Sequence, residues 1–169
     1  MSLHYAQIRR YDVANGEGIR TSVFVTGCTL HCVDCFNVLY QDPAYGTEWS
    51  EETTAQVIGY LRDPNVAGLT LLGGEPMQSP GLVPVVVEEI RCALPEGKTI
   101  WVYSGYTYEQ IVADPDRRRL LELCDVLVDG RFVARLRDLR LRFRGSSNQR
   151  IIAIRPSLAA GTPVLYDPA

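Results

Sequence analysis

The feature that most restricts the fold of this chain is a repeated alternation of short apolar segments with longer amphipathic ones. The pattern predicts five strands, at residues 20–27, 66–74, 98–105, 125–130 and 149–156. It predicts helices between them, at residues 50–63, from about Pro80 to residue 94, and at 107–124, the last broken near Pro115. Strands separated by helices favour right-handed crossovers, so we expect an α/β fold with a parallel sheet, either open or curled toward a barrel.

The helix predicted at residues 50–63 has the clearest local signals. Ser50 is a suitable capping residue, and the acidic residues that follow it suit the first turn of a helix. We expect Ala55, Ile58 and Leu61 to lie on its buried face, because their spacing matches the helical period.

Composition excludes several classes of protein. The 169 residues contain no internal repeat, and 46% of them are hydrophobic, so we expect a single domain over residues 1–169. The net charge of -3 gives no sign of nucleic-acid binding. No apolar run approaches the roughly 20 residues of a membrane span, and the amino end has no apolar core of a signal peptide. We therefore expect a cytoplasmic protein, in which clustered cysteines indicate metal binding or catalysis rather than disulfides.

Unusual residues follow four of the predicted strands. A cysteine-rich loop follows the first strand, and "GGEPM", "YSGY" and "DGRF" follow the second, third and fourth. The carboxyl ends of parallel strands face the same way and carry the active site in such folds. We therefore expect the four loops to meet at one mouth.

Three of the five cysteines lie in the loop after the first strand. Cys28, Cys32 and Cys35 have the spacing C-x3-C-x2-C. Thiolates bind zinc and iron–sulfur clusters alike, but structural zinc sites usually have four ligands in two separated pairs. Within the loop, His31 is the alternative fourth ligand, although it adjoins Cys32. A four-iron cluster held by three thiolates would instead keep one iron open for a ligand. The other two cysteines are predicted to be small apolar core residues; they are Cys92 and Cys124.

This cysteine spacing at the end of a first strand resembles the signature of the radical S-adenosylmethionine superfamily. "LLGGEPM", about forty residues later, resembles the superfamily's Gly-Gly-Glu-Pro element, which binds the methionine amino group. The resemblance implies one [4Fe-4S] cluster with three cysteine ligands, and S-adenosyl-L-methionine as the second cofactor. It implies cofactor contacts by Gly73, Gly74 and Glu75. We also expect apolar cover for the cluster from Phe24, Leu30 and Phe36.

The amino-terminal segment "VANGEGIRTSVFVTGC" resembles the run that leads into the cluster strand in activating enzymes of glycyl-radical proteins. Asn15 and Glu17 stand where many members have Asp and Pro, while Gly16, Gly18 and Arg20 match. As a plain turn, "NGEG" would also be unremarkable.

The carboxyl-terminal half resembles one family within this group, the anaerobic ribonucleoside-triphosphate reductase-activating proteins. "RGSSNQR" (residues 144–150) matches its signature almost letter for letter, and "WVYSGYTYEQI" and Asp129-Gly130-x-Phe132 match further elements. The family commonly has glycine before the third cysteine, where this chain has Asp34, followed by an aromatic residue and Asn, as in Phe36 and Asn37. The resemblance implies an incomplete, TIM-like α/β barrel of the radical S-adenosylmethionine type. We expect the cofactor-binding set to be Asp34, Cys35, Phe36, Gly73, Gly74, Glu75, Ser104, Asn148 and Arg150. Asp34, which departs from the family, could accept a hydrogen bond from the adenine or only cap the loop.

The implied activity is that of an oxidoreductase that activates anaerobic (class III) ribonucleotide reductase. The resemblance implies reductive cleavage of S-adenosylmethionine and abstraction of hydrogen from a glycine of the reductase large subunit, with no catalytic side chain beyond the cluster ligands. A low-potential donor such as flavodoxin would supply the electron, and no nucleic acid or membrane is expected as a partner.

Two other functions stay open. One is an activase of another glycyl-radical enzyme of the pyruvate formate-lyase type, which "GSSNQR" and the lack of extra cysteine clusters disfavour. The other is a non-catalytic zinc module. The arginine-rich segment from Arg131 to Arg144 is best interpreted as a solvent-exposed face of the protein. The alternative interpretation is a docking surface for the reductase. Ser146, Asn148 and Arg150 could bond the cofactor's ribose or carboxylate.

Overall fold

The computed structural model describes residues 2–79 and 81–168, with side chains throughout these ranges except at 83–85. Within them, one mixed sheet of seven strands has the order β3-β1-β2-β4-β5-β6-β7. The strands are β1 (His4–Asp12), β2 (Ile19–Val25), β3 (Thr47–Glu48), β4 (Val66–Gly73), β5 (Thr99–Tyr103), β6 (Val126–Asp129) and β7 (Arg150–Ala153). The helices are α1 (Glu51–Leu61), α2 (Glu88–Ala93), α3 (Tyr108–Val112), α4 (Pro115–Glu122) and α5 (Ile154–Ala160). Shorter helical turns are η1 (Val38–Gln41), η2 (Pro76–Gln78), η3 (Leu82–Val87) and η4 (Ala134–Leu136).

The sheet is parallel only in its middle. β2, β4, β5 and β6 run parallel, whereas β1 pairs with β2 and β3, and β7 pairs with β6, in antiparallel fashion. The prediction of an all-parallel sheet was therefore wrong at both edges. The chain passes from β1 to β2, and from β6 to β7, without an α-helix between the strands. Adjacent strands joined in this way run antiparallel, because parallel neighbours need a crossover connection, which is usually a helix. β1 was also missed: β3 covers only its first two residues, and β1 is largely half-buried or exposed, so its sequence has no continuous apolar run.

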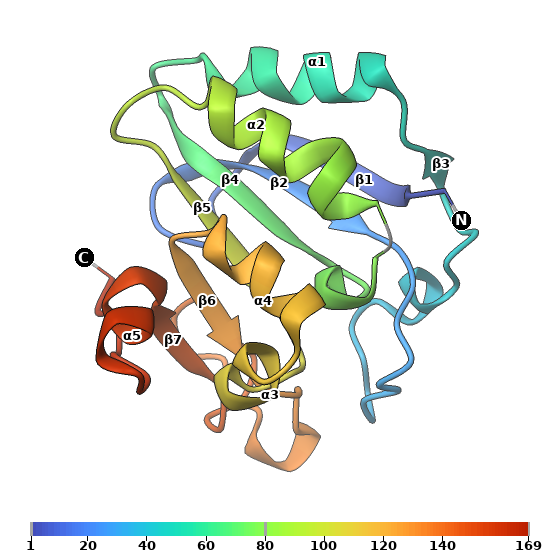
Figure 1. Ribbon diagram of the computed structural model, residues 1–169. Coiled ribbons are helices and arrows are strands. Elements are labelled where there is room, and N and C mark those ends of the chain that lie inside the picture. The colour runs from blue at the N-terminus through green and yellow to red at the C-terminus, as the bar shows by residue number, and fades with distance from the viewer. Residues whose placement is uncertain (1, 80, 169) are drawn as a thin grey trace.

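The helices α1, α2 and α4 cover one face of the sheet (Figure 1). Alternate residues of the parallel strands point to that face and form the main core with the helices, because side chains of a strand alternate between its faces. The opposite face has a smaller apolar cluster made by Trp101, Val126, Val128 and Ile151, against which Tyr103, Phe143 and Tyr166 pack. None of the helices in residues 2–79 and 81–168 has the length and apolar composition needed to cross a lipid bilayer.

The helix signals were largely correct. Ser50 caps α1 by accepting a hydrogen bond from the Thr53 N–H, and Asp114 caps α4, which begins at Pro115. The predicted buried face of α1 was wrong in part, because Ala55 is exposed, Ile58 is half-buried and only Leu61 is buried. The helix instead buries the set Thr53, Thr54, Val57 and Leu61. The predicted start of the next helix, at Pro80, lies outside the described residues.

Candidate functional site

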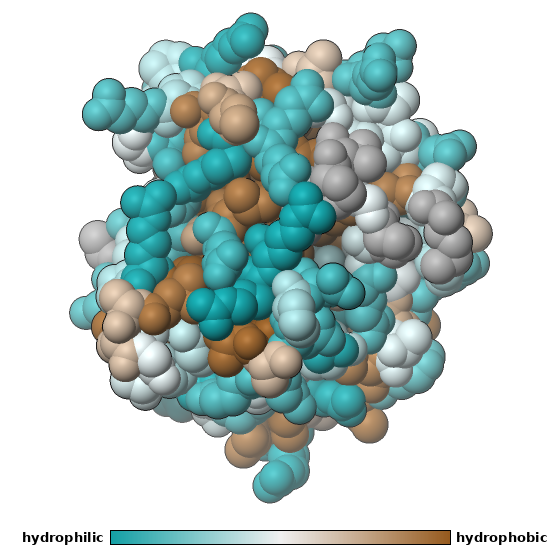
Figure 2. All heavy atoms as spheres, viewed as in Figure 1, coloured by the Kyte–Doolittle hydropathy of each residue, from teal (hydrophilic) through white to brown (hydrophobic). Residues whose placement is uncertain are grey.

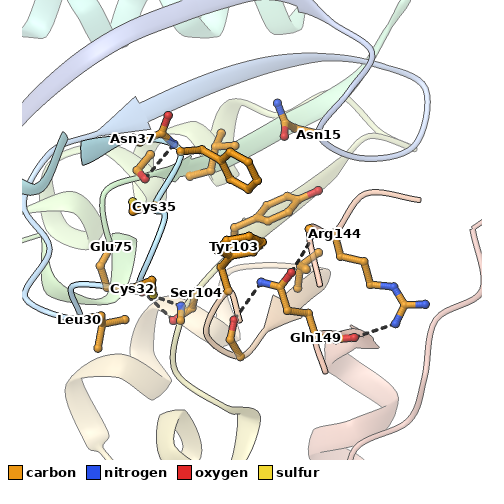
Figure 3. Close-up of a pocket in the computed structure, with 18 of the residues that line it drawn as sticks. Asn15, Leu30, Cys32, Cys35, Asn37, Glu75, Tyr103, Ser104, Arg144 and Gln149 are labelled. Atoms are coloured by element: carbon orange, nitrogen blue, oxygen red, sulfur yellow. Dashed lines mark hydrogen bonds between the residues drawn. The ribbon is translucent and has the colours of Figure 1, made fainter. Parts of the chain in front are cut away.

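The four loops that follow β2, β4, β5 and β6 enclose one cavity of about 450 Å³. This volume lies within the range of small-molecule sites. Strand residues Leu72, Tyr103 and Val128 form its floor, so the cavity lies on the sheet face opposite the main core. Figure 3 shows Cys32, Cys35, Glu75 and Ser104 on one side of it and Arg144 and Gln149 on the other. The predicted convergence of the loops is confirmed.

The three clustered cysteines all line this cavity as free, half-buried thiols. Backbone hydrogen bonds fix the start of their loop, from the Gly27 N–H to the Tyr40 carbonyl at 2.8 Å and from the Cys28 N–H to the Gln41 carbonyl at 3.0 Å. Burial raises the pKa of the Cys28 thiol, and a hydrogen bond from the backbone of Leu30 opposes the rise. In the part of the chain that the structure describes, no three His, Cys, Asp or Glu side chains are arranged to hold a single metal ion. The ligands of a four-iron cluster each reach a different iron, so such a cluster needs no convergence on one point.

Two residues of the cysteine loop adopt left-handed backbone conformations. His31 has φ 49° and Asp34 has φ 56°. Aspartate tolerates this region better than most residues, and glycine tolerates it best, so Asp34 suits a position where glycine would also serve. The Asp34 side chain is exposed and does not line the cavity. His31 Nδ1 lies 2.8 Å from the Gln41 side-chain oxygen.

The glycine pair after β4 brings the backbone against the cysteine loop. The Gly74 N–H donates to the Val25 carbonyl and the Glu75 N–H to the Gly27 carbonyl, both at 2.8 Å. A Cβ on Gly74 would lie 2.7 Å from the carbonyl oxygens of Gly27 and Tyr40. Gly73 has φ 114°, and a Cβ there would lie 2.4 Å from the Val25 oxygen. Both positions therefore require glycine.

Glu75 is a buried carboxylate that only neutral groups bind directly. Its Oε1 accepts hydrogen bonds from the Ser104 hydroxyl at 2.8 Å and the Met77 N–H at 3.0 Å, and its Oε2 accepts from the Gly105 N–H at 2.7 Å. The residue is 1% exposed. Burial raises its pKa to about 6 despite these hydrogen bonds. Ser104 thus reaches the cavity as a support for Glu75.

The loop before β2 is anchored by a buried arginine. Arg20, at 1% exposure, donates hydrogen bonds to Thr70 Oγ1, Thr99 Oγ1 and the carbonyls of Glu17, Leu69 and Thr99. Thr70 in turn donates to the Asn15 carbonyl, and Asn15 lines the cavity. Gly16 and Gly18 have positive φ, as a tight turn requires. The matched positions in this segment therefore have a structural role.

Comparison with known proteins agrees with this geometry. Residues 14–152 match a family described as a 4Fe-4S single cluster domain. The chain is 37% identical to the anaerobic ribonucleoside-triphosphate reductase-activating protein of Pasteurella multocida, over 87% of this chain and 95% of that protein. It is 35% identical to the protein of that name in Escherichia coli K12, over 87% and 96%, and 32% identical to that of Enterobacteria phage T4, over 88% and 93%. The chain belongs to this family of reductase-activating proteins.

The family signature "RGSSNQR" contributes Arg144, Gly145 and Gln149 to the wall of the cavity, but not Asn148 or Arg150. Arg150 binds Asp129 and Glu109, with Nη2–O distances of 2.5 and 2.7 Å, and Asn148 is exposed and donates to the Arg131 carbonyl. Both residues line a separate surface pocket that shares only Gly105 and Gly130 with the cavity. Ser146 is buried and accepts a hydrogen bond from the Val133 N–H. Their contact with a cofactor stays a prediction.

Two glutamines that the sequence motifs did not single out form hydrogen bonds between the loops around the cavity. Gln149 lines the cavity, where its side chain accepts from the Gly145 and Ser146 N–H groups and donates to the Gly130 carbonyl. Gln78 accepts from the Thr29 N–H at 2.9 Å and donates to the Thr29 hydroxyl at 2.9 Å and the Tyr106 hydroxyl at 2.7 Å. Gln78 therefore ties together the loops after β2, β4 and β5. The only sign of this role in the sequence is that Gln78 lies three residues after Glu75, close to the glycine-rich motif.

Two of the three apolar residues expected to cover a cluster lie at the cavity. Leu30 and Phe36 line the cavity, and Phe36 packs on Phe132 with ring centroids 4.7 Å apart. Phe24 does not line it; it is buried against Tyr40, with its ring beneath the Arg9 guanidinium. Cys124 is buried, as predicted, but Cys92 is exposed on α2, so its assignment to the core was wrong.

Proposed function

We propose that this protein activates an anaerobic (class III) ribonucleotide reductase by reductive cleavage of S-adenosylmethionine at a [4Fe-4S] cluster and abstraction of hydrogen from a glycine of the reductase. The observation that carries the proposal is the meeting of three cysteines, the Gly73-Gly74-Glu75 loop and Ser104 at one cavity. The names of the relatives support the partner, and the 4Fe-4S family supports the cluster.

The donor set fits a cluster with three protein ligands. Cys28, Cys32 and Cys35 supply soft thiolates, which suit iron–sulfur clusters. Held by these three thiolates, the cluster would supply the single electron needed for reductive cleavage of S-adenosylmethionine, the chemistry by which hydrogen would be removed from the glycine of the reductase. No side-chain acid or base is needed for this chemistry.

The remaining residues of the cavity would bind the cofactor and exclude water. Gly73 and Gly74 expose backbone without a Cβ, and the buried Glu75 carboxylate suits an ammonium group. Leu30 and Phe36 supply apolar cover. For Asp34, Asn148 and Arg150 we retain cofactor contact as a hypothesis. An Arg150→Ala variant with unchanged cofactor affinity and activation would remove it for that residue.

The same proposal includes the wider context of the protein. We propose one domain over residues 1–169, whose open sheet is the incomplete barrel of the superfamily. A low-potential donor such as flavodoxin would reduce the cluster in the cytoplasm, a compartment that keeps thiols reduced.

The test is anaerobic reconstitution followed by reduction with dithionite. We expect about four irons per chain, a brown protein and formation of 5′-deoxyadenosine. Cys32→Ala is expected to abolish that product, whereas Cys92→Ala, which alters an exposed thiol on α2, is the matched control. A colourless protein with one zinc would refute the proposal. Electron paramagnetic resonance then tests for a glycyl radical, with the reductase and a formate-lyase type enzyme compared as partners.

A further inference from the structure

Exposed apolar side chains gather at the mouth of the cavity. Phe36 and Leu139 both line the cavity, yet they are 62% and 84% exposed. Val33, Val38 and Leu39 belong to the same loop as Phe36 and are also largely exposed. Exposed apolar patches often mark interaction sites, because contact with a partner removes their apolar surface from water.

The same mouth carries a concentration of positive charge. The connection between β6 and β7, residues 130–149, contains six arginines and one acidic residue, Asp138, in a chain whose net charge is -3. The arginines are Arg131, Arg135, Arg137, Arg140, Arg142 and Arg144. This segment, called the basic arm below, projects at the lower end of the molecule in Figure 1. Figure 2 shows brown and teal atoms side by side at that tip.

The basic arm is held in place beside the cysteine loop. Its two halves pair at Arg137 and Ser146, and the Ser147 N–H donates to the Leu136 carbonyl at 3.0 Å. The Arg137 guanidinium lies 5.4 Å from the centre of the Phe36 ring. Arg140, at the tip, is paired with Asp138, yet its side chain is 91% exposed. The arm therefore presents Leu139 and Arg140 in a fixed setting, which lowers the entropy lost on binding.

We propose that the basic arm and Phe36 form the docking surface for the reductase, and that they bind a reductase segment in which carboxylates flank an apolar side chain. The proposal rests on the proposed function. A glycine Cα that reaches the cavity must belong to a chain that passes over this rim. Charge complementarity selects an acidic segment, and the exposed Leu139 and Phe36 select an apolar side chain within it.

The experiment measures binding of the anaerobically prepared holoprotein to the reductase by calorimetry. The test variant is Arg135→Glu with Arg140→Glu, two exposed residues outside the cavity. The matched control is Arg62→Glu with Arg155→Glu, which makes the same change in net charge. These exposed residues follow α1 and lie in α5, at the opposite end of the parallel strands.

At about 0.1 M salt we expect the test variant to bind the reductase at least about tenfold more weakly, and the control within about twofold of the parent. The parent should lose affinity as salt rises, with a smaller loss in the test variant. Equal binding by test and control variants would overturn the proposal. The proposal would also be overturned if the parent bound single-stranded DNA more tightly than the reductase and the test variant lost this binding. The basic arm would then be a nucleic-acid binding surface.

Cleavage of S-adenosylmethionine without the reductase separates this proposal from the proposed function. We expect both double variants to retain it, because none of the four arginines lines the cavity. Failure of the parent protein to cleave the cofactor would refute the proposed function. If the test variant cleaved the cofactor normally and bound the reductase as tightly as the parent does, only the proposal that the basic arm is the docking surface would be refuted.

Discussion

The buried carboxylate of Glu75 should make the stability of the metal-free protein depend on pH in a direction opposite to that of most carboxylates. Its pKa is raised from 4.5 to about 6 because burial penalises the charged form, and this shift corresponds to about 2 kcal/mol. Since the folded state binds the proton more tightly than the unfolded state, stability is lost as the pH rises from about 4.5 to about 6.

The measurement is urea unfolding of the metal-free protein under reducing conditions, from pH 4 to pH 7.5. Other groups also titrate in this range, so the quantity to follow is the difference in unfolding free energy between the parent and Glu75→Gln. Glutamine cannot ionise, but its amide group would oppose the Gly105 N–H, so a constant offset of about 1–3 kcal/mol is expected.

On top of that offset, the parent should lose about 2 kcal/mol relative to Glu75→Gln between pH 4 and pH 7.5. A difference that is independent of pH would show that the Glu75 pKa is not raised. A difference that changes in the opposite direction would show that the hydrogen bonds to the carboxylate outweigh its burial.

Three further predictions concern the loops and their anchor. Gly74→Ala should destabilise the protein by about 1–3 kcal/mol in urea unfolding, because the new Cβ would clash with rigid backbone. Gly59→Ala, in α1 with open space around it, should instead stabilise the protein by about 0.5–1 kcal/mol. Equal effects of the two substitutions would contradict this reasoning. Gln78→Leu should cost about 1–3 kcal/mol and speed the loss of iron to a chelator, while exposed Gln56→Leu should leave the rate unchanged. Arg20→Lys should cost about 2–4 kcal/mol, because three N–H donors cannot serve five buried acceptors, and a cost below 1 kcal/mol would refute that role.

The middle of the fold was predictable because its strands are buried on both faces. Val23, Leu69, Val102 and Leu127 belong to continuous apolar runs, and each run ends at an unusual loop. The edges were not predictable in the same way. β1 has a polar, half-exposed sequence, and the antiparallel direction of β7 depends on a connection without a crossover helix.

Some residues of the cavity could be predicted from sequence motifs, whereas the placement of others depends on tertiary contacts. Cys28, Gly74 and Glu75 belong to short motifs next to strand ends, so their placement follows from the sheet. The neighbours Asn148, Gln149 and Arg150 could not be sorted in this way. They lie where the turn before β7 meets its first residue, Arg150, and the hydrogen bonds to Gly130 and Asp129 decide that Gln149 faces the cavity while Arg150 faces away.

A comparison of two buried charged residues, Arg20 and Glu75, suggests why the mouth of the cavity is suited to a charged ligand. Arg20 is a buried cation whose five N–H groups all have neutral acceptors, and it lies among the strands, away from the mouth. Glu75 is a buried anion at the mouth, and no salt bridge to it is formed among the described residues. Three neutral donors lower the cost of burying its charge without cancelling it, since its pKa still rises to about 6. An ammonium group in the cavity would supply the missing countercharge, so cofactor binding should lower the pKa of Glu75, and a pH-independent affinity between pH 5 and pH 7 would argue against that contact.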